Sequence, residues 1–78
     1  MLFPNPVKDV AYLLIGGTSK NIQYIIYDVQ GNVVKDKSIR LESNNRKHPI
    51  DISTLVIGNY FLNVISEQKR ETIKFIKQ

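Results

Sequence analysis

The sequence lacks the residues from which small domains usually build covalent or metal cross-links. Its 78 residues contain no cysteine, no tryptophan and a single histidine, His48. A chain of this length supplies one core of limited size, so a second independent domain is excluded. Because neither a disulfide nor a zinc site is available, stability has to come from strand pairing and apolar packing.

Long apolar runs are also missing. The longest one, Val10 to Ile15, is far below the ~18 residues that a membrane-spanning helix needs. No basic segment followed by an apolar stretch opens the chain, so we expect neither a membrane span nor an export signal here. The net charge of +4 could suit an anionic partner, but acidic residues are interspersed with basic ones, and no nucleic-acid ligand is expected.

The pattern that is present is an alternation with a period of two. Between Asn21 and Asp28 every apolar residue is β-branched or aromatic, which is typical of an inner strand. Comparable runs bounded by turn residues start near Val10, Val33, His48 and Asn59, and a last one follows the polar turn at 67–70. This spacing predicts an all-β fold, a small Ig-like, Greek-key β-sandwich of six or seven antiparallel strands.

The first nine residues differ from the rest. Pro4-Asn5-Pro6 cannot be helical, because each proline fixes its own φ and restricts the residue before it. We therefore expect a single domain over residues 1–78, in which 1–9 are an extended lead-in that holds any preceding segment away from the fold. Residues 10–78 would form the sandwich.

Several polar residues have positions that predict turns. Asp28 and Gly31 occupy the first and fourth places of a type I turn followed by a G1 bulge. Asp51 and Ser53 precede a short segment that predicts one helical or 3₁₀ turn, capped by Ser53 and ended by Gly58 with positive φ. The glycines at 16 and 17 lack the order of a phosphate-binding loop and predict a hairpin loop.

The residues do not form a constellation for catalysis. His48 is the only base that titrates near neutral pH, and it stands beside Pro49 without a cysteine or an elbow serine to activate. Asp28 and Asp51 are better explained by their turns than as a glycosidase pair. No ligand spacing suits a metal. We predict no catalytic residue, no metal site and no cofactor.

Four segments gain weight from their order and spacing. They are Phe3-Pro4-Asn5-Pro6-Val7-Lys8-Asp9, Ile26-Tyr27-Asp28-Val29-Gln30-Gly31-Asn32-Val33-Val34, Ile50-Asp51-Ile52-Ser53-x-Leu55-x-x-Gly58-x-Tyr60-Phe61-Leu62 and Lys74-Phe75-Ile76-Lys77-Gln78. Over almost the whole chain they resemble the type A C-terminal sorting domain of cargo proteins of the type IX secretion system. Asn32 replaces the family's usual lysine or arginine, and Val56-Ile57 replaces its usual Pro-Ala. Neither departure alters the expected fold.

The resemblance implies a non-catalytic secretion signal. Such a domain directs an N-terminal passenger protein from the periplasm across the outer membrane through the type IX translocon, and in many members a surface protease then removes it. The protein would be exported to the cell surface or secreted. Met1 would then not be the native start of translation, because a passenger would precede it.

The resemblance also suggests which residues the translocon recognises. They lie in the last strand and in the corner before it: Gly58, Tyr60, Lys74, Phe75, Ile76, Lys77 and Gln78. Core packing explains Tyr60 and Phe75 equally well, and backbone conformation explains Gly58. Tyr60 also stands where sandwich folds place a tyrosine whose hydroxyl bonds back to the corner. Lys74 and Lys77 are the preferred candidates, as cations expected to face solvent.

Two other functions remain open from the sequence. An adhesion or carbohydrate-binding module would present an exposed aromatic platform in which Tyr12, Tyr27 or Phe61 lie side by side on one face. A nucleic-acid-binding sandwich, the weaker alternative, would bind single strands with a steep dependence on salt.

Overall fold

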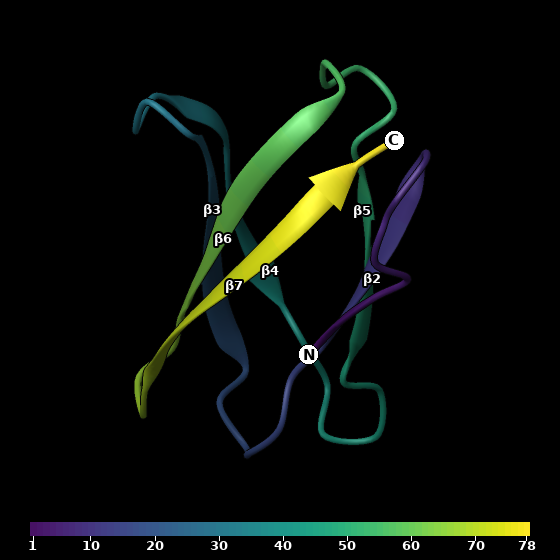
Figure 1. Ribbon diagram of the computed structural model, residues 1–78. Coiled ribbons are helices and arrows are strands. Elements are labelled where there is room, and N and C mark those ends of the chain that lie inside the picture. Colours follow the sequence, from purple (N-terminus) through teal and green to yellow (C-terminus); the bar gives the residue numbers. More distant parts are fainter.

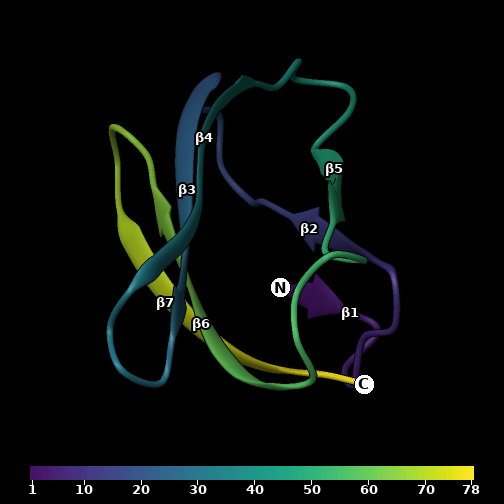
Figure 2. The same ribbon diagram turned by 90° about the horizontal axis from the view of Figure 1, so that it is seen from above.

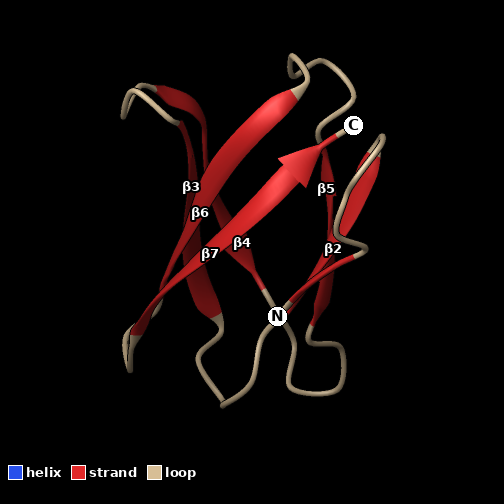
Figure 3. Cartoon of the chain, viewed as in Figure 1, coloured by secondary structure: helices blue, strands red, loops and turns tan.

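The computed structural model describes residues 1–78 and consists of strands and connections without a helix (Figure 3). The seven strands are β1 (Leu2–Phe3), β2 (Val10–Leu14), β3 (Asn21–Asp28), β4 (Val33–Arg40), β5 (Lys47–Asp51), β6 (Gly58–Ile65) and β7 (Arg70–Lys77). The predicted all-β fold of six or seven antiparallel strands is confirmed.

The strands form two sheets that pack face to face (Figures 1 and 2). One sheet has the order β1-β2-β5 and the other the order β4-β3-β6-β7, with antiparallel neighbours throughout. The chain changes sheet after β2, after β4 and after β5, as a Greek-key sandwich requires. The loop at 16–20 is therefore a crossing from β2 to β3, and its prediction as a hairpin loop is wrong.

A single core fills the space between the two sheets. Alternate residues of β3 and β6 point into it, because successive side chains of a strand face opposite sides. Fourteen buried apolar residues form one cluster: Val7, Ala11, Leu13, Ile15, Ile22, Tyr24, Ile26, Leu41, Ile50, Ile52, Tyr60, Leu62, Val64 and Phe75. The larger sheet supplies its two inner strands, β3 and β6, to the centre of this core.

Two of the four edge strands, β4 and β5, are polar and protected. Pro49 lies in β5 opposite Tyr12, and its missing N–H is tolerated because β5 is an edge. Lys35 of β4 donates from Nζ to the Asp51 carbonyl oxygen (2.9 Å), which links the two sheets. Exposed charges along β4 discourage pairing with another chain. The pairing of β3 with β4 shifts register between Ile26 and Tyr27, where Val34 of β4 has no partner.

Residues 1–9 are more closely integrated than the expected lead-in. Leu2 and Phe3 form β1 and pair with Leu13 and Tyr12 of β2. Val7 is completely buried in the core. The segment therefore packs along the sandwich.

Both predicted turns have local hydrogen bonds that explain their residues. The Gly31 N–H donates to the Asp28 carbonyl oxygen (3.1 Å), and Gly31 has the positive φ of a G1 bulge, 85°. At the second turn the Ser53 N–H donates to Asp51 Oδ1 (3.0 Å) and the Leu55 N–H to the Ile52 carbonyl oxygen (3.1 Å). The i→i+3 bond is that of a single 3₁₀-type turn that does not continue as a helix, and the side chain that accepts at its start is Asp51 and not the predicted Ser53.

Candidate recognition site

The structure brings together the residues that the resemblance suggested. Across the β6–β7 pair Gly58 lies opposite Lys77, and Tyr60 lies opposite Phe75. These pairs stand at one end of the larger sheet, where β6 begins and the chain ends (Figure 1). Residues about twenty positions apart in the sequence thus form one corner of the sandwich.

Two of these residues belong to the core. The side chain of Phe75 is 1% exposed and that of Tyr60 is 6% exposed, and their rings stack with centroids 5.6 Å apart. A protein partner could not touch either ring without opening the sandwich. Both rings therefore have a structural role in the fold.

The expectation that Lys77 faces solvent is wrong. Lys77 is 7% exposed, and its Nζ donates to the carbonyl oxygens of Lys8 and Gln78. The reason lies in the alternation of β7, since Lys77 follows Phe75 by two positions and shares its inward face. Its amine escapes the core because the strand ends there, and backbone carbonyls replace the water it has lost.

Gly58 and Tyr60 together build the corner before β6. The Tyr60 hydroxyl donates to the Val56 carbonyl oxygen four residues upstream (2.5 Å). This is the arrangement of a tyrosine corner at the start of the penultimate strand. Gly58 has a φ of 155°, and a Cβ there would meet no atom within 4 Å, so its role is conformational and not one of close packing.

Residues 5–8 hold the last strand, which no sequence pattern indicated. We call these residues the N-terminal strap. The Val7 N–H donates to the Ile76 carbonyl oxygen (2.8 Å), and the Gln78 N–H donates to the Val7 carbonyl oxygen (2.7 Å). The Ile76 N–H donates to Asn5 Oδ1 (3.1 Å). Figure 2 shows the yellow C-terminal end reaching the purple N-terminal segment. No local pattern pairs Asn5 with a strand seventy-one positions away.

The outer surface of this corner carries apolar side chains beside one cation. Ile76 is 43% exposed and Phe61 is 37% exposed, and Lys74 lies directly opposite Phe61. Tyr27 is the neighbour of Phe61 on the other side. We call these four residues the terminal face. Tyr12 lies in the smaller sheet under the Lys47 amine, 4.7 Å from its ring centre, so the three aromatics do not form one platform.

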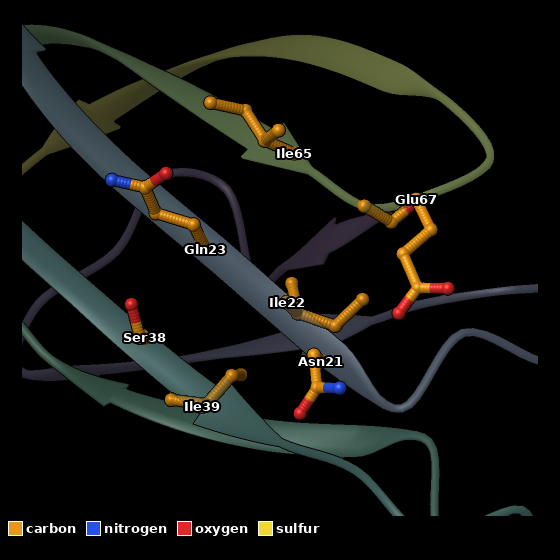
Figure 4. A pocket seen from close by; sticks show the side chains of 8 residues that line it. Asn21, Ile22, Gln23, Ser38, Ile39, Ile65 and Glu67 are labelled. Carbon is orange, nitrogen blue, oxygen red and sulfur yellow. The ribbon is translucent and has the colours of Figure 1, made fainter.

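A shallow hollow of about 330 Å³ lies at the opposite end of the larger sheet (Figure 4). Gln23, Ser38 and Ile65 line it, and Glu67 is its only ionisable side chain. Nothing in it is arranged for acid–base or nucleophilic chemistry. The chain has no group of three metal-ligating side chains, and no helix with the length and apolarity to cross a membrane.

Burial raises the pKa of Tyr24, and three other titratable groups have lowered pKa values. The Asn32 backbone N–H, with further bonds from Asn32, Gln30 and Gly31, holds the pKa of Asp28 below 3.8. Hydrogen bonds from the Ser53 hydroxyl and N–H, together with the charge of Lys35, lower the pKa of Asp51. Burial, and then the charge of Lys37, lowers the pKa of His48 below 6.5.

These shifts predict that acid destabilises the fold. The folded-state pKa is below the unfolded value for all three groups, so the unfolded chain binds more protons as pH falls. Stability should therefore decline below pH 6.5 as His48 titrates and decline again below 3.8 as the two aspartates titrate. The check is the urea midpoint as a function of pH. Asp28→Asn, which keeps an acceptor oxygen, should flatten the lower step.

Asp9→Asn is the matched control, since the Asp9 carboxylate has no partner in the fold. Equal acid sensitivity of Asp28→Asn and of the unchanged protein would contradict the assignment of that step to Asp28.

One protein-family model covers this corner together with the rest of the chain. No curated protein matches the chain, but the family model described as "Secretion system C-terminal sorting domain" matches residues 1–78. Domains of this family are C-terminal signals for type IX secretion, which implies export across the outer membrane to the cell surface or the medium; the family is not catalytic. The match extends over the strap, the corner and the last strand, and the chain belongs to the family of secretion system C-terminal sorting domains.

Proposed function

We propose that the outer-membrane translocon of the type IX system recognises this domain through the terminal face and the last residues of β7. The passenger would be joined ahead of residue 1, and a surface protease would separate it from the domain after export. The site residues in direct contact would be Lys74, Ile76 and Gln78. Gly58, Tyr60, Phe75 and Lys77 would support them from within the fold.

The observation that carries this proposal is the set of side chains without a structural task at the end of β7. Lys74, Ile76 and Gln78 are exposed, and none of their side chains makes a hydrogen bond or a salt bridge. Ile76 and Phe61 expose apolar surface next to the Lys74 cation. An apolar area flanked by a charge suits a protein partner better than solvent.

Lysine on an edge strand can also serve to prevent aggregation, and the two roles have different requirements. Any charged residue protects an edge, whichever its sign. A partner that binds the cation distinguishes lysine from glutamate, because reversing the charge replaces attraction by repulsion. Lys74→Glu therefore separates recognition from edge protection.

The test uses a reporter with an ordinary export signal and this domain at its C-terminus, expressed in a type IX-competent cell. Lys74→Glu combined with Ile76→Ser should lower the surface and secreted amount by about tenfold, the effect of ~1.4 kcal/mol of lost binding free energy. The reporter should accumulate in the periplasm. Arg70→Glu, at the far end of the same strand, is the matched control and should be secreted normally.

Removal of residues 74–78 should abolish export, but it also removes Phe75 from the core. The double variant Lys74→Glu with Ile76→Ser is therefore the decisive test, since both side chains are exposed and the domain should remain folded. If the double variant and the unchanged fusion reach the surface equally, the terminal face is not the recognised surface.

A further inference from the structure

The last residues of β7 would be an open edge without the N-terminal strap. Ile76 directs its N–H and its carbonyl oxygen away from β6, and both are bound by the strap, to Asn5 Oδ1 (3.1 Å) and to the Val7 N–H (2.8 Å). Proline stands on both sides of Asn5 and cannot donate a backbone N–H. The side chain of Asn5 thus does for Ile76 what a neighbouring strand would do.

Lys77 holds the same segment from the inner side. Its amine bridges the carbonyl oxygen of Lys8 in the strap and that of Gln78 at the chain end. Because little of Lys77 is exposed, these carbonyl oxygens take the place of water at its amine, which favours the arrangement with the strap in place. The bond from the Ile76 N–H to Asn5 and the bond from the Lys77 amine to Lys8 together hold the end of β7 against the strap.

We propose that Asn5 and Lys77 are positioning residues of the sorting signal. They fix the terminal strand so that Lys74, Ile76 and Gln78 are presented in one arrangement, and the two ends of the domain then make up a single recognition element. This inference rests on the proposed function of the terminal face. A strand end without the strap would fray, and the translocon would have to order it on binding, which weakens binding.

Amide hydrogen exchange on the 78-residue chain tests the positioning itself. In Asn5→Ala the amide of Ile76 should exchange about tenfold faster and that of Gln78 also faster, because local opening then breaks fewer strap contacts. The amides of the inner strand β3 should exchange as before. Asn5→Asp loses the long bond from Asn5 Nδ2 to the Lys74 carbonyl oxygen (3.5 Å) but retains an acceptor oxygen for the Ile76 N–H, so it should restore slow exchange at Ile76.

Asn63→Ala is the matched control for this measurement. Asn63 accepts a hydrogen bond from the Thr72 hydroxyl (2.8 Å) on the outer face of the same sheet, so its loss removes a comparable contact away from the strap. Lys77→Met, which keeps the apolar stem and removes the amine, should loosen the Gln78 amide. Unchanged exchange at Ile76 and Gln78 in both Asn5→Ala and Lys77→Met would overturn the proposal.

The secretion assay tests the consequence for sorting. Asn5→Ala and Lys77→Met should each lower export of the reporter fusion several-fold, whereas Asn5→Asp and Asn63→Ala should be exported like the unchanged fusion. Full export of Asn5→Ala with a loosened terminal strand would overturn the positioning role alone. Periplasmic retention of the unchanged fusion would overturn the proposed function, and the positioning role with it.

Discussion

Alanine in place of Phe75 is expected to cause one of the two largest losses of stability in the domain. The ring of Phe75 is 1% exposed and stacks on Tyr60 between the two sheets. Replacing a buried phenylalanine with alanine costs about 3–5 kcal/mol, through lost burial and the cavity that remains. At about 0.05–0.15 kcal/mol per residue, a domain of this length has only ~4–12 kcal/mol in total.

Equilibrium urea unfolding measures this effect, with Phe75→Leu as the control. Leucine keeps most of the apolar volume and should cost about 1–2 kcal/mol, so that variant should remain folded. Phe61→Ala is a second control, since Phe61 lies on the outer face of the neighbouring strand. If Phe75→Ala unfolds at the same urea concentration as the unchanged protein, Phe75 does not belong to the core.

This prediction also affects how truncations of the domain are interpreted. Loss of export after removal of the last five residues is compatible with a lost recognition surface and with a lost fold. Phe75→Ala should lower export through loss of the fold, while Lys74→Glu with Ile76→Ser should lower it in a folded domain. The two results together distinguish a linear C-terminal signal from one that requires the folded sandwich.

The alternation of the sequence was sufficient to predict the strands and many of their faces. Tyr60, Leu62 and Val64 share the buried face of β6 because side chains two positions apart point the same way. The turn at Asp28 could be predicted equally well, since its carboxylate accepts from the N–H groups of Gln30 and Asn32, both at 2.9 Å. Both features depend on residues close in sequence.

The remaining features depend on contacts between distant residues. A two-residue period does not say which sheet a strand joins. The glycines at 16 and 17 therefore predict a hairpin, although the loop at 16–20 crosses between sheets. The strap joins Asn5 to Ile76 by a single side-chain oxygen, which leaves no periodic trace in the sequence. The inward position of Lys77, in contrast, follows from the alternation of its strand. Only its charge favoured a position at the surface.

The N-terminal and C-terminal motifs contact each other in the fold. In the sequence they are separate segments at opposite ends of the chain, and in the fold they share three backbone and side-chain bonds at Ile76 and Gln78. The Pro-Asn-Pro segment therefore has a structural reason that is independent of any preceding passenger. Together with Val7 it binds the backbone groups of the last strand that β6 leaves without a partner.

The second large effect is expected at Tyr60, where the ring and the hydroxyl contribute separately. Tyr60→Ala removes a buried aromatic and should cost about 3–5 kcal/mol, as at Phe75. Tyr60→Phe keeps the ring and removes only the bond to the Val56 carbonyl oxygen, which should cost about 1 kcal/mol. Val56 is exposed, so water can replace part of that bond.

Urea unfolding of the two Tyr60 variants separates these contributions, and Tyr27→Phe is the matched control. The Tyr27 hydroxyl has no hydrogen-bond partner in the fold, so its loss should change stability by less than about 0.5 kcal/mol. Tyr60→Phe should also increase the exchange of the Gly58 amide, because the hydroxyl ties the corner at Val56 to the start of β6. A Tyr60→Phe variant as stable as Tyr27→Phe would show that the corner is held by ring packing alone.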